Sequence, residues 1–366
     1  MASAAGNKVK VIITVPQLSR PGGVSALYNI ARLDNIDGID YFQIHGFGGK
    51  NPLTRIFDLI YIYLKFAFQV VKYDVVESNP SLASKSFFRD AIFIYISLLF
   101  NKKVIVYWHG WNDDYEEKIN KTGSLKKIFL ASYGQAHLNI VLGSVFKSKL
   151  IAMGVTSKII VESNTATDEF IATEHVLPKK IEDGKLISCL FLARIEVEKG
   201  IYIAIDAIRL LSKDLKIKLV VGGDGSALSD VKKYVAEHKI ENIEFAGYVN
   251  GKAKHALLAS ADLFIFPTYH KEGMPINLIE AMLYGLPLIS TSVGGIPDWV
   301  EDGKNGFLLN SLEPKDYAET IKKLLENKTL YYSISKNNVE KADKFFKPHA
   351  FNQRMLSYYQ SIKLNS

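Results

Sequence analysis

The 366-residue sequence contains one cysteine, Cys189, so the chain can form neither an internal disulfide nor a cysteine-based metal cluster. This cysteine usage suits a reducing cytoplasm. The first ten residues, MASAAGNKVK, show no signal-peptide pattern and lead straight into an apolar run. We therefore expect a cytoplasmic protein.

The sequence also lacks a long hydrophobic run without charges. The most apolar stretch, residues 53–71, contains Asp58 and Lys65 and is too polar and too short for a membrane span. We expect a helix packed on a sheet here and again at residues 87–100. The alternative is an amphipathic surface for membrane contact, with Arg55, Lys65 and Lys72 close to anionic lipid.

Excess positive charge is confined to one half of the chain. Residues 1–165 hold 19 Lys and Arg against 12 Asp and Glu, whereas residues 166–366 hold 26 of each. A basic half predicts an acidic partner, which is a nucleic acid, an anionic membrane or a phosphorylated acceptor. Because no helix-turn-helix, zinc-finger or RNP pattern occurs, nucleic acid is the weakest of the three, and we expect no nucleic-acid partner.

The length predicts two domains, and a hydrophobic content of 48% is ample for two cores. The polar stretch 171–185 is typical of a linker, which places one domain at residues 1–170 and the other at residues 186–346. Residues 347–366 predict a helix that returns to the first domain. Residues 113–127 are polar and charged and predict a mobile loop leading into a helix.

The most informative stretch is residues 262–301. An apolar run ends at Pro267, a polar loop follows, and a helix begins near Pro275. Gly285 is predicted to adopt the left-handed conformation that ends the helix, and a second apolar run comes directly afterwards. These features predict one βαβ unit with parallel strands.

The junction between this loop and this helix is the chemical part of the unit. Gly273 lets backbone come close to a ligand, and the amides near Met274 and Asn277 form the positive end of the helix dipole, which suits a phosphate. Glu272 and Glu280 flank the junction, about 12 Å apart if the whole stretch were helical. A diphosphate, a ribose and a sugar would fit such a span; the alternative is a capped surface helix with two solvated glutamates.

Basic and histidine side chains follow two other strands. Arg194 and Lys199 come after a buried strand and can both reach a diphosphate. His109 follows the strand KVIVYW and is expected to face a ligand, unless it is a hydrogen-bonded structural histidine. The turn at Gly22-Gly23 admits close contact with a ligand, or is a plain tight turn.

Two glycine-containing strand ends complete the pattern. One strand ends in Gly222-Gly223-Asp224-Gly225 and another in Gly247-Tyr248-Val249. A loop of the second kind can bracket a nucleobase with its backbone groups.

Together these elements resemble the retaining glycosyltransferases of family 4. The most specific match is Glu272-Gly-Met-Pro followed by Glu280-Ala-Met, because the family carries two glutamates separated by seven residues. Further matches are the basic diphosphate pair, the N-terminal glycine loop and the histidine after a first-domain strand, which correspond to Arg194 with Lys199, Gly22-Gly23 and His109. The family pattern is altered at Ala193, Asn164-Thr165 and Asp298.

The resemblance implies an α/β chain of the GT-B fold, in which two Rossmann-like domains face each other across a cleft. The first domain would bind the acceptor and the second a nucleotide-diphosphate sugar. Catalytic roles would fall to His109, Arg194, Lys199 and Glu272. Donor-binding roles would fall to Gly22, Gly23, Gly223, Gly247, Tyr248, Val249, Gly273, Met274, Asn277, Leu278 and Glu280.

In this scheme Glu280 binds the donor ribose and Glu272 a hydroxyl of the transferred sugar. Arg194 and Lys199 neutralise the leaving diphosphate, and His109 contacts the transferred sugar. The reaction implied is retaining and needs neither a cofactor nor a metal, and the sequence has no Asp-x-Asp motif.

The expected partners are a nucleotide-sugar donor, a glycan or lipid-linked acceptor and an anionic membrane surface at the inner face of the membrane, as in bacterial surface polysaccharide assembly. The alternatives are a nucleotide-sugar 2-epimerase of the same fold and a non-catalytic nucleotide- or glycan-binding subunit.

Overall fold

The structure, a computed structural model, describes residues 8–20, 22–44, 52–166 and 177–364, with side chains from residue 56 onward in the third range. The chain forms two compact units. Unit 1 comprises residues 1–163 and 348–366, and unit 2 comprises residues 164–347. Of the expected linker, residues 171–176 lie outside the described residues.

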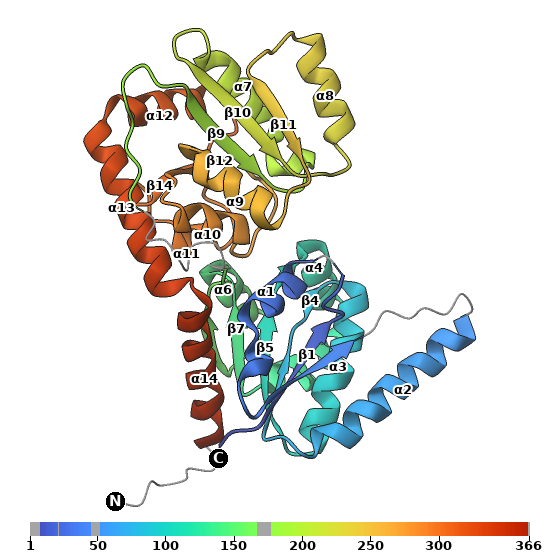
Figure 1. The fold of residues 1–366 in the computed structure, drawn as a ribbon. Coiled ribbons are helices and arrows are strands. Elements are labelled where there is room, and N and C mark those ends of the chain that lie inside the picture. Colours follow the sequence, from blue (N-terminus) through green and yellow to red (C-terminus); the bar gives the residue numbers. More distant parts are fainter. Residues whose placement is uncertain (1–7, 21, 45–51, 167–176, 365–366) are drawn as a thin grey trace, which may run out of the picture. The chain divides into compact units, whose positions relative to one another are not determined.

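Unit 1 is built on a parallel six-stranded sheet (Figure 1). In sheet order its strands are β2 (Ile39–Ile44), β1 (Val11–Pro16), β3 (Val75–Ser78), β5 (Lys103–Trp108), β7 (Leu138–Val141) and β8 (Lys158–Val161). A small second sheet pairs β4 (Ser81–Leu82) with β6 (Gly110–Trp111). The helices are α1 (Gly23–Ala31), α2 (Pro52–Val70), α3 (Ser84–Leu99), α4 (Asp113–Lys121), α5 (Gly123–Ala131), α6 (Ser144–Ala152) and α14 (Pro348–Leu364).

Helix α14 packs on unit 1, although it is the last helix of the chain. Two nitrogens of the Arg354 guanidinium, Nε and Nη2, donate to the buried carboxylate of Glu162 at 2.9 Å. The Tyr359 hydroxyl donates to Glu77 on β3 at 2.7 Å. A bidentate pair of this kind fixes orientation as well as contributing energy.

Unit 2 has a second parallel six-stranded sheet. Its strands in sheet order are β11 (Ile243–Gly247), β10 (Ile217–Gly222), β9 (Ile187–Leu192), β12 (Leu263–Phe266), β13 (Leu288–Thr291) and β14 (Gly306–Leu309). Around it lie α7 (Ile201–Leu211), α8 (Leu228–Glu237), α9 (Gly251–Ser260), α10 (Ile276–Leu283), α11 (Ile296–Trp299), α12 (Pro314–Glu326) and α13 (Lys328–Phe345).

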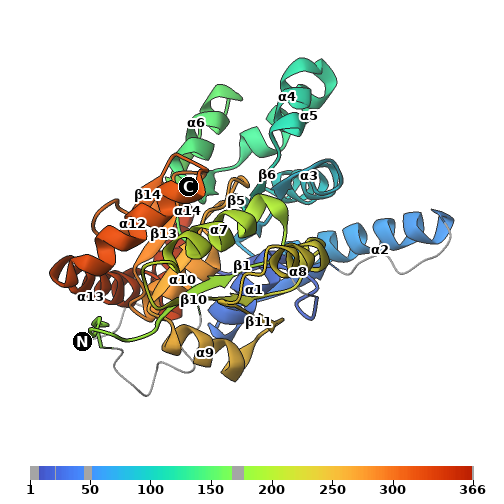
Figure 2. The same ribbon diagram turned by 90° about the horizontal axis from the view of Figure 1, so that it is seen from above.

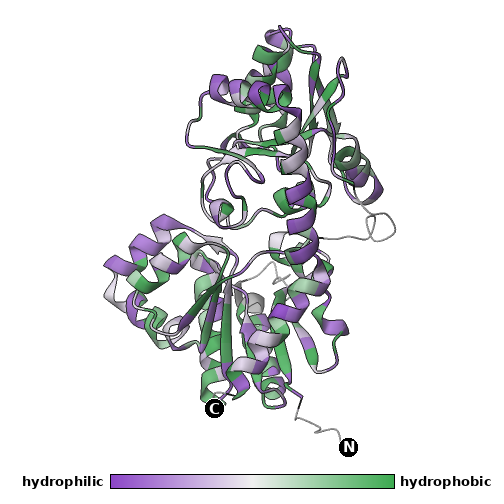
Figure 3. Cartoon of the chain, turned by 90° about the vertical axis from the view of Figure 1, so that its left-hand side faces the viewer, coloured by the Kyte–Doolittle hydropathy of each residue, from purple (hydrophilic) through white to green (hydrophobic). Residues whose placement is uncertain are grey.

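The sheet of unit 2 reverses its strand order between β9 and β12. Chain order runs outward from β9 to β11 on one side and from β12 to β14 on the other, which is the doubly wound Rossmann order. In Figure 3 the strands of both sheets are coloured mostly as hydrophobic and the helices carry more hydrophilic residues. Ligands of such sheets bind at the carboxyl ends of the strands, beside the point of reversal.

The predicted βαβ unit is confirmed. Strand β12 ends directly before Pro267, α10 begins one residue after Pro275, and Gly285 follows the helix with a φ of 66°. The Gly285 carbonyl accepts a hydrogen bond of 2.6 Å from Ser335 on α13. A Cβ at Gly285 would lie 2.8 Å from that same hydroxyl, so both conformation and packing favour glycine there.

One local prediction is wrong. Residues 113–127 are not a loop leading into a helix but most of two helices, α4 and α5. The side chain of Asn112 accepts from the amide of Tyr115 at 2.7 Å and so caps α4. Acidic residues fill its first turn and lysines its last, which complements the helix dipole. The helices expected near 53–71 and 87–100 are confirmed as α2 and α3.

Candidate functional site

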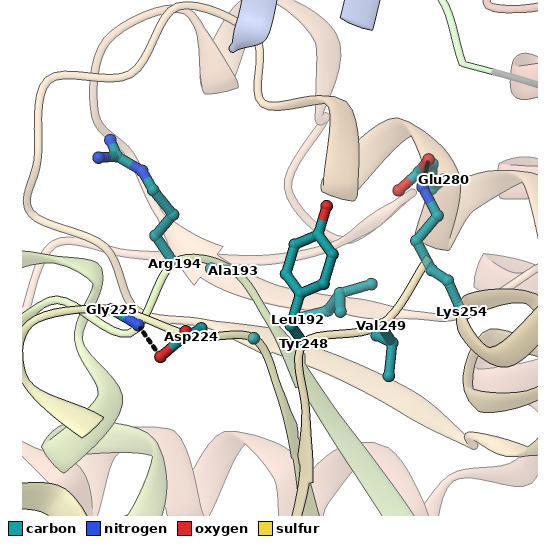
Figure 4. A pocket seen from close by; sticks show the side chains of 10 residues that line it. Leu192, Ala193, Arg194, Asp224, Gly225, Tyr248, Val249, Lys254 and Glu280 are labelled. Atoms are coloured by element: carbon teal, nitrogen blue, oxygen red, sulfur yellow. Dashed lines mark hydrogen bonds and ion pairs between the residues drawn. The ribbon is translucent and has the colours of Figure 1, made fainter. Parts of the chain in front are cut away.

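A cavity of about 590 Å³ opens at the carboxyl edge of the unit 2 sheet (Figure 4). It is formed by the loops after β9, β10 and β11 together with one residue each from α9 and α10. Its lining residues are Leu192, Ala193, Arg194, Gly223, Asp224, Gly225, Tyr248, Val249, Lys254 and Glu280. The cavity therefore lies at the point of strand-order reversal, where a doubly wound sheet binds ligands.

Arg194 supplies a positive charge to this cavity and adds to the hydrogen bonds from Ser226 that lower the pKa of the Glu196 carboxyl. Its side chain is exposed, and no ion pair or hydrogen bond holds the guanidinium among the described residues. In Figure 4 the side chains of Arg194 and Tyr248 extend from their loops toward the same side of the sheet. The ring of Tyr248 is 72% exposed, so its face is open to a ligand.

Glu280 and Lys254 form an ion pair at the other end of the cavity. Lys254 Nζ lies 2.5 Å from Glu280 Oε1, and the two side chains are 28% and 6% exposed. Burial raises the pKa of the Glu280 carboxyl above its ordinary value, although Lys254 opposes the shift. The described residues supply no partner for the second oxygen, Oε2, so the carboxylate can still accept hydrogen bonds from a ligand.

Lys199 and Glu272 form a second, more buried ion pair beside the cavity. Their charged atoms are 2.5 Å apart and their side chains 9% and 13% exposed. The same carboxylate oxygen accepts from the hydroxyl of Thr268 at 3.2 Å. Two residues predicted to act on different parts of a donor are thus joined to each other in this structure.

Glycine at position 294 allows the loop that carries Glu272 to pack closely. Gly294 has a φ of 58°, and a Cβ built on it would lie 1.8 Å from the Glu272 carbonyl oxygen. The amide of Gly295 donates to that oxygen at 3.1 Å. The position of Glu272 is therefore fixed by backbone contacts from the turn after β13.

The start of α10 presents a group of unsatisfied amides. No described residue accepts from the amides of Gly273, Met274, Ile276 and Asn277. The Asn277 side chain donates to the Leu192 carbonyl at 2.6 Å, which ties the helix start to the end of β9. The Leu278 amide is different, because it already donates to Asn277 Oδ1 at 2.9 Å and is less available to a ligand than predicted.

The glycines after β10 and β11 have structural reasons of their own. Gly223 has a φ of 139°, and a Cβ there would lie 1.9 Å from the Ala193 carbonyl oxygen. Gly223 thus lets two strand-end loops cross, in addition to lining the cavity. Gly247 needs glycine only for its φ of 69°, since a Cβ would meet nothing within 4 Å.

His109 lies in unit 1, directly after β5. Its Nε2 is 2.7 Å from Asn79 Oδ1, while Asn79 Nδ2 donates to the Thr14 carbonyl at 3.0 Å. Because this orientation makes Oδ1 an acceptor, His109 carries its proton on Nε2 and leaves Nδ1 as an acceptor. Loss of hydration lowers the pKa of His109 to about 3, so the ring is neutral at physiological pH.

Behind His109 a buried hydrogen-bond network surrounds Glu77. Its carboxylate accepts from the hydroxyls of Tyr28 and Tyr359 and, at 3.4 Å, from Asn79. Burial raises the pKa of Glu77 despite these hydrogen bonds. The network fixes Asn79, and through it the tautomer of His109.

The glycine turn of unit 1 has no packing reason to be glycine. Gly22 has extended backbone and precedes α1, and a Cβ on it would come no closer than 3.8 Å to Ser25. A Cβ on Gly23 would meet nothing within 4 Å. Side chains would fit at both positions as far as unit 1 itself is concerned.

The structure thus brings some of the predicted residues together and leaves others apart. Arg194, Gly223, Tyr248, Val249 and Glu280 line one cavity. Not among its lining are Lys199, Gly247, Glu272, Gly273, Met274, Asn277 and Leu278, while Gly22, Gly23 and His109 belong to unit 1.

Sequence reasoning missed Lys254, Asp224, Glu77 and Asn79. A lysine one turn into the helix after the Gly247-Tyr248-Val249 loop was the available signal for Lys254.

Within the described ranges, no group of three or more His, Cys, Asp or Glu side chains is placed to hold a metal ion. In the same part of the chain, no helix is long and apolar enough to cross a membrane.

Comparison with known proteins finds a family match in the second half of the chain. Residues 174–341 match the family model described as glycosyl transferases group 1. An uncharacterized glycosyltransferase of Methanocaldococcus jannaschii, MJ1069, is 26% identical over 330 residues, which cover 85% of this chain and 80% of that protein.

A second relative is the putative colanic acid biosynthesis glycosyltransferase WcaL of Salmonella typhimurium, which is 25% identical over 270 residues. These cover 71% of this chain and 64% of that protein, so the chain spans less than two thirds of this relative.

The fold comparison covers nearly the whole chain. The crystal structure of Anabaena Alr3699/HepE in complex with UDP superimposes with a TM-score of 0.73 at 16% identity, over 96% of this chain and 100% of that one. The GT-B fold class and the resemblance to glycosyltransferases are confirmed. Placement in family 4 stays a prediction.

Proposed function

Because residues 174–341 match the group 1 glycosyl transferases, we propose that this chain is a retaining glycosyltransferase that moves a hexosyl group from a nucleotide-diphosphate sugar to a glycan or lipid-linked acceptor. The observation that carries the proposal is the cavity of unit 2. It combines an exposed tyrosine, a carboxylate–lysine pair and an exposed arginine without a direct ion pair among the described residues, at the switch point of a Rossmann sheet.

The nucleoside part of the donor would occupy the cavity between Tyr248 and Glu280. The open face of Tyr248 can stack on a base, and the backbone of Gly247 to Val249 can bracket it. Glu280 would accept hydrogen bonds from the ribose hydroxyls through its unpaired oxygen. Lys254 would keep this buried carboxylate ionised and in place.

The diphosphate would lie between Arg194 and the start of α10. Arg194 can grip phosphate oxygens with two parallel N–H groups, and the unsatisfied amides add the positive end of the helix dipole. Lys199 is already balanced by Glu272, so Arg194 contributes more net positive charge than Lys199 does. These groups would stabilise the leaving diphosphate without a metal ion.

Glu272 would bind a hydroxyl of the transferred sugar rather than attack its anomeric carbon. A carboxylate held by Lys199 and Thr268 is not a free nucleophile. Retention would then follow from front-face displacement, in which the leaving phosphate takes the acceptor proton. His109, neutral and with Nδ1 as acceptor, would contact a sugar hydroxyl, as the resemblance implies.

The biological setting belongs to the same proposal. The relative from Salmonella is named for colanic acid biosynthesis, which is consistent with a role for this chain in surface polysaccharide biosynthesis. The UDP complex of the Anabaena protein makes UDP the first nucleotide to test. We propose a cytoplasmic enzyme that works at the inner face of the membrane.

The test is donor consumption across a panel of UDP, GDP and ADP sugars with EDTA present. We expect one donor to release its nucleotide slowly in the absence of acceptor, with mass detection of nucleotide and free sugar. Appearance of an epimerised nucleotide sugar would favour a 2-epimerase instead. Nucleotide binding without turnover, even with glycan or lipid-linked acceptors added, would favour a non-catalytic subunit.

A further inference from the structure

Helix α2 of unit 1 exposes an unusual set of large apolar side chains. The exposed fractions of Phe57, Tyr61 and Phe68 are 70%, 68% and 77%. Ile56, Ile60, Leu64 and Val71 are each at least 50% exposed. Soluble proteins rarely expose apolar residues in such density unless the surface binds something.

These side chains form one stripe along α2, which Val71 continues directly after the helix. At about 100° per residue around the helix axis, the seven exposed apolar positions fall within an arc of about 140°. Ile62, Phe66 and Val70 lie on the opposite side and are buried against the sheet with Phe42 and Phe93. The helix is therefore apolar on two faces, and only one of them is used by the fold of unit 1.

Helix α3 adds a second exposed stripe next to the first. Tyr63 of α2 contacts Phe93 of α3 at a ring-centroid distance of 5.0 Å, so the two helices pack together. The residues of α3 and its end that are exposed by 42–65% are Phe88, Ile92, Tyr95, Leu99 and Phe100. Figures 1 and 2 both show α2 beside α3, with its N-terminal half extending beyond the rest of unit 1.

The charges around these stripes are mostly positive. Residues 56–72 and 84–103 together hold six Lys and Arg against two Asp. One of the two, Asp90, is buried and paired with Arg89. Lys65 and Lys72 border the stripe of α2. Lys102 follows the end of α3, and its Nζ donates to the Val71 carbonyl at 3.0 Å.

The exposed apolar stripes and the positive charges around them together favour one kind of binding partner. A second copy of the chain would bring the same excess of positive charge against itself. An anionic bilayer complements it, because apolar side chains enter the acyl boundary while lysines remain at the headgroups. We propose that the outer face of α2 and α3, named here the α2–α3 face, docks unit 1 on an anionic lipid bilayer.

The proposal stands on the surface of unit 1 and requires no transfer activity. Its test is sedimentation of the full-length chain with vesicles of phosphatidylcholine containing about 30% phosphatidylglycerol, compared with pure phosphatidylcholine, at low salt. We expect binding to the anionic vesicles that weakens in pure phosphatidylcholine and at high salt. No nucleotide sugar is present, so the result is independent of the proposed reaction.

Two variants separate the apolar and electrostatic contributions. The triple variant Phe57→Glu, Tyr61→Glu, Phe68→Glu should lose at least about tenfold in vesicle affinity, because it removes the stripe. Lys65→Glu with Lys72→Glu should weaken binding to anionic vesicles and flatten the salt dependence. The matched control is Leu177→Glu, Leu186→Glu, Leu312→Glu, three exposed leucines of unit 2, which should bind as the wild type does.

Three outcomes would overturn the proposal. The wild type could ignore anionic vesicles, or the triple glutamate variant, folded by circular dichroism, could bind them unchanged. Alternatively, light scattering could show a wild-type dimer that the triple variant dissociates without any lipid binding, which would make the face a contact between copies. If the triple variant fails to fold, the lysine variant and the salt series decide.

Discussion

The two units differ in the polar groups that they place at the carboxyl edge of a parallel sheet. Those of unit 2 are ion pairs, Lys254–Glu280 and Lys199–Glu272. Those of unit 1 form a network around the buried Glu77 that ends on a neutral histidine. Ion pairs beside an exposed arginine suit an anionic ligand, whereas a neutral imidazole suits sugar hydroxyls.

The largest effect is expected at Arg194, whose guanidinium forms no direct ion pair with another described residue. Arg194→Ala should lower kcat/KM for transfer by about 100-fold to 1,000-fold, because a preorganised donor to a developing anion is lost. Thermal stability should hardly change, since the side chain is exposed and makes no ion pair with another described residue. Arg209→Ala on α7 is the control for loss of a positive charge outside the cavity, although Arg209 pairs with Asp206. Equal losses in both variants would remove the special role of Arg194.

Breaking the more buried ion pair should affect folding as well as activity. Lys199→Met leaves the Glu272 carboxylate largely buried without its cation and should lower the free energy of unfolding by about 3 kcal/mol. The double variant Lys199→Met, Glu272→Gln should recover most of that stability in urea denaturation. It should not recover transfer. Recovery of transfer along with stability would show that the pair is only structural.

A smaller effect is expected at the ribose end of the cavity. Glu280→Gln keeps the shape but loses the charge, so nucleotide affinity should fall about 10-fold to 100-fold, as for lost hydrogen bonds to an ionised group. Calorimetry of nucleotide binding measures this change. Glu237→Gln on α8 provides an exposed control. Unchanged affinity would place the nucleoside elsewhere.

The smallest effect concerns pH and unit 1. The folded pKa of His109 is about 3 against an ordinary value of 6.5, so the unfolded chain binds more protons between these values. Stability from this site is complete above about pH 6.5 and falls as pH drops toward 3, by at most about 1.4 kcal/mol per pH unit.

His109→Asn should therefore flatten the loss of stability between pH 7 and pH 5 in chemical denaturation. His349→Asn, at an exposed position on α14, should not. If the free energy of unfolding of the His109 variant depended on pH as it does in the wild type, the assignment of a neutral His109 would be contradicted.

The sequence predicted best what is local. Between Pro267 and Gly285 the sequence predicts a loop, a helix and a left-handed glycine, because residues close together in the chain determine each of them. The structure confirms all three. The same local reasoning failed at residues 113–127, where high charge suggested a loop. The charges there are ordered along the helix dipole and capped by Asn112, and that order was the overlooked signal.

The partners of the site residues could not be predicted, because they come from distant parts of the chain. Lys254 reaches Glu280 from a different helix, and Asn79 meets His109 across two strand ends. Gly223 was predicted from a donor-binding pattern, yet its φ and its contact with Ala193 already require glycine. A pattern of residue spacing can identify a glycine such as Gly223. It does not show whether the glycine is needed for contact with a ligand or for close packing of two backbone segments.

Unit 2 is proposed to bind a nucleoside diphosphate through its cavity without a metal. The direct measurement is isothermal titration calorimetry of the wild type and of Arg194→Ala with UDP, GDP and ADP, in EDTA. We predict saturable binding of one nucleotide by the wild type and at least about tenfold weaker binding by the variant. Failure of all three nucleotides to bind the folded wild type, or equal binding by both proteins, would contradict this proposal.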